Sequence, residues 1–139
     1  MTGKKNKLRT TYTPTSEDRK LVERAHRKIV EERLYCNPEL TLDLLANQLQ
    51  VTRNTLSRAI NHTTGKNFKK YINEYRIKEA IRLLQIPENQ NITLEAIIEM
   101  AGFNSRTPFY ETFKSVTGYT PTEYLRKNKK KNPEKEYSV

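Results

Sequence analysis

The sequence predicts an all-α fold in which two similar pairs of short helices are joined by one long linker helix and preceded by an additional N-terminal helix. Residues 68–84, FKKYINEYRIKEAIRLL, contain no Gly or Pro and predict one helix of about 25 Å. The apolar residues of its two halves lie on nearly opposite sides. Such a helix is suited to join two small units, although the central helix of one ordinary core would also be apolar on several sides.

Charge is the main constraint from composition. The 139 residues include 26 Lys and Arg against 16 Asp and Glu, a formal net charge of +10. This excess indicates a polyanionic partner, either nucleic acid or an acidic membrane surface. No apolar run approaches the length of a membrane span, and no long predicted helix separates a basic face from a broad apolar one, so membrane contact by this segment is not expected.

Thiol and metal chemistry are not expected. Cys36 is the only cysteine, which excludes an intrachain disulfide framework and a multi-cysteine zinc site. It could act as a nucleophile, but no adjacent base supports that role, and we expect a partly buried thiol in a reducing cytoplasm. His26 and His62 are expected at the surface. We therefore expect no metal, no cofactor and no enzymatic activity.

The N-terminal segment divides into a basic arm and a helix. Residues 1–13 are basic and almost free of apolar side chains, which predicts a flexible arm that either touches phosphates or is a solvated tail. Residues 14–40 predict a lead-in helix that starts at Ser16, with acidic residues in its first turn, and continues to about Leu34. Its apolar stripe contains Leu21, Val22, Ala25, Ile29 and Val30.

Residues 41–66 predict two short helices joined by a tight turn. Thr41 caps a helix over 42–49, and Thr52 caps a second helix over 53–61 that stops near Gly65. Two short helices with a brief connection have the helix-turn-helix layout. Alone, this signal is moderate, because many helical proteins contain such hairpins.

The same pattern returns after the linker helix, assigned to residues 67–86, and the loop that follows it. Residues 92–127 predict a helix over 94–101 capped by Thr93, a turn, and a helix over 105–117 that ends at Gly118. A capping box between Thr120 and Glu123 then opens a last short helix. Residues 128–139 are assigned to a basic, polar tail.

The two units match position by position, which is the strongest structural signal in the sequence. Caps, core residues and stops correspond, with one extra residue in the second turn. The matched pairs are Thr41 and Thr93, Ala46 and Ile98, Val51 and Phe103, Leu56 and Phe109, Ile60 and Phe113, and Gly65 and Gly118.

The outward side chains of each second helix are chemically mixed, which suits reading of base edges better than phosphate attraction alone. An ordinary solvated helix face would explain either set singly, but it explains less well why both units carry one. We expect base contacts from Arg53, Asn54, Ser57 and Arg58 in the first unit and from Arg106, Thr107, Tyr110 and Glu111 in the second. We expect phosphate contacts from Thr52, Asn61, Ser105 and Lys114.

The predicted core is drawn from the apolar periodicity of every helix after residue 41. It contains Leu45, Ala46, Leu56, Ile60, Phe68, Ile72, Ile77, Ala80, Leu84, Phe103, Phe109, Phe113, Pro121 and Tyr124.

From about Thr41 to Arg126 the chain closely resembles the DNA-binding domain of AraC/XylS-type transcription regulators. The first unit carries the resemblance in LLANQLQVTRNTLSRAINHTTGKNFKKYINEYRIKEAIRLL, and the second carries it in AGFNSRTPFYETFKSVTGYTPTEYLR. Residues that fall at the family's signature positions are Gly102, Phe103, Phe109, Phe113, Lys114, Gly118, Pro121 and Tyr124.

The resemblance implies two helix-turn-helix units that bind successive major-groove segments on one face of the duplex. It also implies base contacts from Asn54, Ser57, Arg58, Arg106, Thr107 and Glu111, all of which the outward-face reading had selected.

We therefore expect sequence-specific binding to double-stranded DNA and transcription regulation. A single chain would cover a non-palindromic site of about two helical turns. The chain would be the C-terminal module of a larger regulator, with RNA polymerase as a partner and a dimer possible only through a further domain.

The alternative is an architectural or recombination accessory factor with weak sequence preference. A DNA-repair enzyme that transfers an alkyl group to cysteine is remote, because Cys36 lies outside both units. We expect a cytoplasmic, nucleoid-associated protein.

Overall fold

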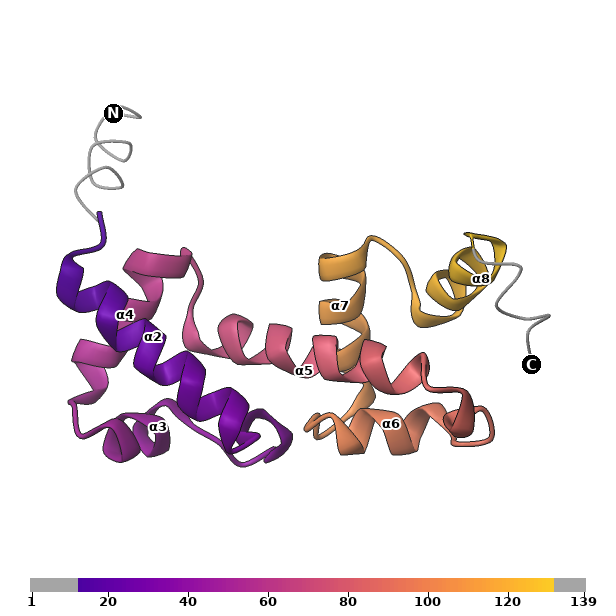
Figure 1. Ribbon diagram of the computed structural model, residues 1–139, viewed down its shortest axis with the longest axis horizontal. Coiled ribbons are helices and arrows are strands. Elements are labelled where there is room, and N and C mark those ends of the chain that lie inside the picture. Colours follow the sequence, from indigo (N-terminus) through magenta and orange to yellow (C-terminus); the bar gives the residue numbers. More distant parts are fainter. Residues whose placement is uncertain (1–12, 132–139) are drawn as a thin grey trace. The chain divides into compact units, whose positions relative to one another are not determined.

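The computed structural model describes residues 13–131, with side chains described through Asn128, and every regular element within these residues is a helix (Figure 1). The predicted all-α fold class is thus confirmed. The elements are α2 (Ser16–Glu31), η1 (Leu34–Cys36), α3 (Leu42–Leu49), α4 (Arg53–Thr64), α5 (Phe68–Leu84), η2 (Pro87–Asn89), α6 (Leu94–Met100), α7 (Arg106–Thr117) and α8 (Pro121–Lys131). The predicted basic arm lies outside the described residues, except for Thr13, and so does the tail from residue 132 onward.

Helix α2 ends earlier than predicted. It stops at Glu31 instead of continuing to about Leu34, because Arg33 adopts a left-handed backbone conformation with φ of 52°. This conformation is costly for a residue with a Cβ atom and cannot continue a helix. The short 3-10 turn η1 follows directly.

Helices α4 and α8 extend beyond their predicted ends. α4 continues past Asn61 to Thr64 and stops where Gly65 takes a left-handed φ of 75°, which glycine adopts without steric cost. α8 runs to Lys131 although the tail was assigned from residue 128. Lysine favours helix, and Pro133 is the next residue in the sequence that cannot continue one.

The chain divides into two compact units between Ile72 and Asn73, so that α5 contributes to both. In the first unit α2 packs on α4 and on α3. The Arg24 Nη2 atom donates a hydrogen bond of 2.9 Å to the Leu49 carbonyl at the end of α3. The buried apolar side chains of these three helices are Leu21, Ala25, Ile29, Leu45, Ala46, Leu49, Leu56, Ala59 and Ile60.

Two members of the predicted α2 stripe are not buried, since Val22 is half-buried and Val30 is exposed. Val30 is 45% exposed, because the inner face of α2 follows the spacing of Asp18, Leu21, Ala25 and Ile29. Val30 lies about 100° around the helix from Ile29 and therefore points away from that face.

The second unit has an aromatic core. Phe109 is fully buried, and its ring centroid lies 5.4 Å from that of Phe103 and 5.5 Å from that of Phe113. Tyr124 of α8 packs edge-on against Phe113 at 5.4 Å. The same core contains Ile77, Ala80 and Leu83 of α5 with Ile97, Ile98 and Ala101 around α6, and Ile81 and Leu84 pack against it.

Helix α5 buries polar as well as apolar residues. Ile72 and Ile77 are buried, while Phe68 is only half-buried. Asn73 and Glu79 are also buried, although the periodicity of the sequence gives no sign of it. Each has a partner one turn away, since Asn73 accepts from Arg76 Nη1 at 3.1 Å, and Arg82 Nη2 lies 2.7 Å from Glu79 Oε2.

The match between the two units extends to their hydrogen bonds. In each unit the cap threonine of the first helix accepts from the backbone N–H three residues later, and the backbone N–H of the turn residue donates to the carbonyl five residues earlier. At the end of each second helix, a threonine hydroxyl donates to the carbonyl four residues earlier and accepts from the N–H two residues later. The turn residues are Val51 and Phe103, and the closing threonines are Thr64 and Thr117.

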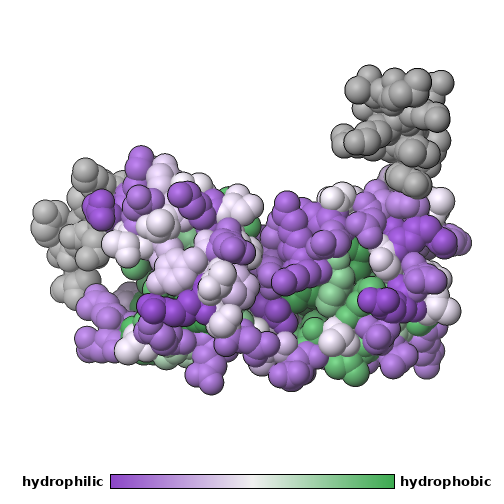
Figure 2. Space-filling view, turned by 180° about the vertical axis from the view of Figure 1, so that it is seen from behind, coloured by the Kyte–Doolittle hydropathy of each residue, from purple (hydrophilic) through white to green (hydrophobic). Residues whose placement is uncertain are grey.

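Hydrophilic residues cover much of each unit on the face shown in Figure 2, with some apolar surface between them. Among the described residues the exposed large apolar side chains are Val30, Leu44, Met100 and Val116. This surface fits a basic, polar chain with a small core in each unit.

Candidate nucleic-acid interface

The second helix of each unit turns one face to its core and a polar face outward. Leu56 and Ile60 of α4, like Phe109 and Phe113 of α7, are fully buried. These residues fix which side of each helix remains accessible. The predicted contact residues that are exposed are Thr52, Arg53, Asn54, Arg58, Asn61, Ser105, Arg106, Thr107, Glu111 and Lys114, whereas Ser57 and Tyr110 are half-buried. Their contacts with DNA stay predictions.

Tyr110 differs from the other predicted readers because it packs against the core. Its ring centroid lies 5.4 Å from that of Phe109 in an edge-to-face arrangement, and the guanidinium of Arg106 lies over the ring at 5.9 Å. The phenol is therefore held at the edge of the core, beside Arg106, the first residue of α7.

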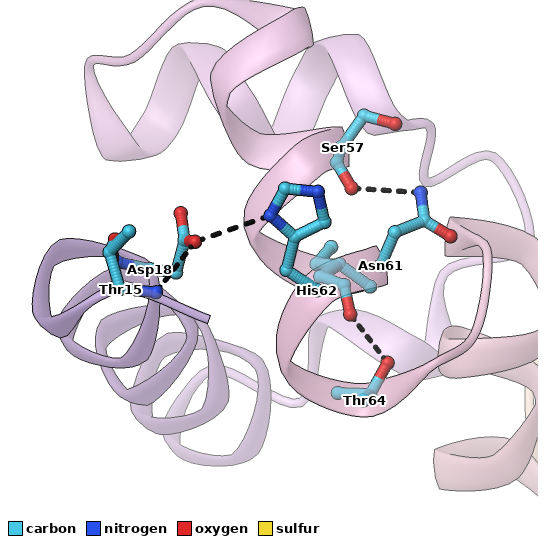
Figure 3. Close-up of polar contacts among 7 residues, drawn as sticks. Thr15, Asp18, Ser57, Asn61, His62 and Thr64 are labelled. Atoms are coloured by element: carbon cyan, nitrogen blue, oxygen red, sulfur yellow. Dashed lines mark hydrogen bonds and ion pairs between the residues drawn. The ribbon is translucent and has the colours of Figure 1, made fainter. Parts of the chain in front are cut away.

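The C-terminal half of α4 is tied to α2 (Figure 3). Thr15 and Asp18 form a capping box, in which each backbone N–H donates to the other residue's side chain at 3.0 Å. The Asp18 Oδ2 atom also lies 3.4 Å from Nδ1 of His62. The predicted surface position of His62 is wrong, because only 18% of its side chain is exposed in this contact. His26 is exposed, as predicted.

The carboxyl group of Asp18 makes the stability of the first unit depend on pH. The backbone N–H of Thr15 lowers the pKa of the Asp18 carboxyl, and the contact with His62 lowers it further. A carboxyl with a lowered folded-state pKa adds stability above its unfolded pKa, and this stability is lost as pH falls through the folded-state pKa.

We expect the unfolding free energy of the wild-type chain to fall more steeply than that of an Asp18→Asn variant as pH drops below about 4. Urea unfolding followed by circular dichroism between about pH 2 and pH 7 measures both curves. Parallel curves for the two proteins would contradict this role for Asp18.

Asn61 is partly engaged within its own helix. Its Nδ2 atom donates to the Ser57 carbonyl at 2.9 Å (Figure 3). A side-chain amide nitrogen carries two hydrogens, so one N–H remains for the phosphate contact predicted for Asn61.

The N-termini of α4 and α7 are capped differently. In α2, α3, α4 and α6 the N-cap threonine accepts from the N–H of the third helical residue. In α7 that third residue is Pro108, which has no N–H. Ser105, the N-cap residue of α7, therefore makes no cap hydrogen bond.

We expect Thr52→Ala to lower the free energy of unfolding by about 1 kcal/mol, and Ser105→Ala to change it far less, because no cap bond is lost. Denaturant unfolding of both variants measures the difference. Thr93→Ala is the control within the second unit, where Thr93 Oγ1 accepts from Ala96 N at 3.1 Å. Equal costs for Ser105→Ala and Thr93→Ala would contradict the explanation.

The arginines of the second helices have different environments. Arg53 Nε lies 3.3 Å from Asp43 Oδ1, and Arg106 Nη2 lies 2.7 Å from Glu95 Oε2. Within the described part of the chain, no ion pair involves Arg58, which is exposed. Its guanidinium is therefore free to meet an external partner.

Asp43 and Glu95 were not among the predicted site residues. A signal for them is present in the sequence, because each follows its cap threonine by two positions in an equivalent helix. Opposite charges at matching positions of a duplicated unit could have pointed to a repeated ion pair.

Residues 13–131 offer no grouping of three or more His, Cys, Asp or Glu side chains that could hold a metal ion. Cys36 is half-buried. A search of the same part of the chain finds no helix with the length and apolarity needed to span a membrane.

The structure contains two helix-turn-helix units, and the second helix of each has a buried apolar face and an exposed polar face. This arrangement is typical of helical DNA-binding domains. A family model described as a helix-turn-helix domain matches residues 45–127, more than half of the chain. The chain belongs to this family of AraC-type DNA-binding transcription regulators, in agreement with the resemblance seen in its sequence.

The chain is similar to regulators and regulator domains of several bacteria. It is 31% identical over 90 residues to the HTH-type transcriptional regulator YdeC of Bacillus subtilis (strain 168), covering 65% of this chain and 30% of that protein. It is 32% identical over 82 residues to a Streptomyces lividans protein named as an AraC-like transcription regulator, covering 59% of this chain and 26% of that protein. The chain thus spans less than a third of the length of these two relatives.

A solved structure is also similar. The C-terminal domain of AraT, a response regulator from Geobacillus stearothermophilus, matches with a TM-score of 0.65 and 28% identity, covering 77% of this chain and 84% of that one.

Proposed function

We propose that this chain is the sequence-reading DNA-binding module of a larger transcription regulator and has no catalytic activity. One observation carries the proposal. Both units present an exposed and chemically mixed face on the second helix, opposite the buried residues that fix the orientation of that helix within its unit. A protein that binds phosphates alone would gain nothing from such a mixture.

The exposed residues match the chemistry of base edges. An arginine can bond two acceptors of guanine, an asparagine can bond adenine, a glutamate can accept from the amino group of cytosine, and a threonine methyl can contact thymine. In α4 these roles fall to Arg58 and Asn54, and in α7 they fall to Thr107 and Glu111. Two different sets predict two different half-sites.

Phosphate contacts would set the register on the duplex. The net charge of +10 supports strong attraction to DNA. At the start of α7 the hydroxyl of Ser105 makes no cap bond, so this hydroxyl and the nearby backbone N–H groups suit a phosphate oxygen.

We propose that the two second helices enter successive major-groove segments about one helical turn, or about 34 Å, apart. One chain would then cover a non-palindromic site of about two turns without dimerising. The two relatives extend far beyond this segment, which supports a larger parent protein. We propose that any dimerisation occurs through a further domain, that the protein contacts RNA polymerase, and that it lies on the nucleoid in the cytoplasm.

Selection of bound duplexes from a random library tests the proposal. We expect a two-part motif, and a preference of at least about 10³-fold for the selected site over scrambled DNA. Titration across salt concentrations separates the charge-driven part of the affinity, which falls steeply with salt on both duplexes.

If the library yields no motif and all duplexes bind equally, the proposal is wrong. The high net charge would then favour the architectural or recombination accessory role, which needs little sequence preference.

A further inference from the structure

The same ion pair occurs in both units, between the first helix and the first residue of the second helix. In the first unit Asp43 Oδ1 lies 3.3 Å from Arg53 Nε, and in the second unit Glu95 Oε2 lies 2.7 Å from Arg106 Nη2. Asp43 and Glu95 each stand two residues after the cap threonine, and both arginines follow the N-cap of the second helix. The pairs are therefore equivalent in the duplication.

The two pairs join equivalent positions with side chains of different length, and the carboxylate lies at Nε of Arg53 but at Nη2 of Arg106. The turn of the second unit is one residue longer, so Arg106 follows Glu95 at a greater sequence distance than Arg53 follows Asp43. The longer glutamate accompanies the longer turn. The pairing of the two positions is thus preserved although both the spacing and the acid differ.

These pairs are poorly placed to stabilise the fold. The four side chains are 58–67% exposed, and ion pairs at such exposed positions contribute little to stability. A carboxylate on a DNA-facing surface also repels phosphates. Two such pairs at matching positions are better explained if each carboxylate orients its arginine.

Each carboxylate leaves part of its arginine available. A guanidinium has five N–H donors in a planar fork. Asp43 lies at Nε, which leaves both terminal nitrogens of Arg53 for a bidentate contact. Glu95 lies at Nη2, so the hydrogens on Nη1 remain, and the ring of Tyr110 lies under the guanidinium at 5.9 Å.

We propose that Asp43 and Glu95 are positioning residues, which hold Arg53 and Arg106 in the orientation that reads guanine and keep them away from phosphates. This inference rests on the proposed function. Each carboxylate restrains a long and flexible side chain before DNA binds, so less rotational freedom is lost when the bidentate contact forms. Its negative charge also makes a nearby phosphate a poorer partner for the same arginine.

The test compares Glu95→Gln with Glu99→Gln. Both substitutions remove one negative charge from α6, and Glu99 is exposed with no ion pair among the described residues. The two glutamine variants and Arg106→Ala are each used to select bound duplexes from a random library. Thermal unfolding of all three variants checks that they fold.

We expect both glutamine variants to bind random DNA somewhat more tightly, because each has lost a negative charge. Only Glu95→Gln should weaken base preference, by about three- to tenfold, at the site position that Arg106→Ala also relaxes. Asp43→Asn should do the same at the position relaxed by Arg53→Ala, with Glu39→Gln as its control.

Three results would overturn the inference while leaving the proposed function intact. In the first, Glu95→Gln keeps or sharpens the wild-type base preference. In the second, it lowers only the melting temperature, as expected of a structural link between α6 and α7. In the third, Arg106→Ala relaxes no position of a site that the protein still selects. A wild-type protein that selects no site at all would instead refute the proposed function.

Discussion

Replacing Phe109 with alanine is expected to lower the free energy of unfolding by about 3–5 kcal/mol, because it removes a fully buried aromatic ring from a closely packed core. The ring is packed against those of Phe103, Tyr110 and Phe113 at 5.4–5.5 Å. The core of the second unit is small, so neighbouring side chains have little means of filling the cavity. Urea unfolding followed by circular dichroism measures the loss.

Leu56→Ala is the matched substitution in the first unit, where the equivalent side chain is also fully buried. We expect a cost of about 2–5 kcal/mol there, without the additional loss of aromatic contacts. If α4 and α7 each read a half-site as proposed, Phe109→Ala should weaken recognition of the α7 half-site more than that of the α4 half-site. A stability loss below about 1 kcal/mol for Phe109→Ala would contradict its role as the centre of the core.

The fold was predictable because its signals are local. Each first helix begins at a threonine that caps the residue three positions later, and each second helix ends at a glycine with positive φ. Such signals act within a few residues and need no knowledge of the tertiary structure. The duplication added a second, independent copy of each one, which is why the helix pairs were placed correctly.

Contacts between distant parts of the chain were not predictable. Asp18 and His62 are far apart in the sequence, and each looks like a surface residue when taken alone. They meet because α2 packs on α4, and the contact buries both. In the same way, Glu79 sits in a helix that is apolar on several sides, so its burial depends on packing that periodicity does not describe.

The outward faces of α4 and α7 were predictable from the sequence, but the ion pairs on those faces were not. Helical periodicity identified the outward side of α4 and α7, because the inward side was fixed by Leu56 and Phe109. It did not show that Arg53 and Arg106 have carboxylate partners, since these partners come from another helix. Periodicity also did not distinguish Arg58 from Arg53. Both arginines point outward on α4, but only Arg53 has a carboxylate partner.

Arg58→Ala is expected to relax base preference at one position of the first half-site, at a cost of about 1–3 kcal/mol in discrimination. Arg58 is exposed on α4, opposite the buried Leu56 and Ile60, and no ion pair involves it among the described residues. All the N–H donors of its guanidinium are therefore available to DNA. Selection from a random duplex library, followed by titration of single-base variants of the site, measures the effect.

Arg58→Lys separates base reading from charge. A lysine keeps the positive charge but lacks the planar fork that bonds two guanine acceptors at once. If Arg58 reads a base, lysine should restore most of the affinity for random DNA and little of the discrimination. If Arg58 binds a phosphate, lysine should restore both, and alanine should weaken all sequences equally while reducing the salt dependence. The second outcome would assign Arg58 to the phosphate backbone and leave Arg53 and Asn54 as the proposed sources of sequence discrimination on α4.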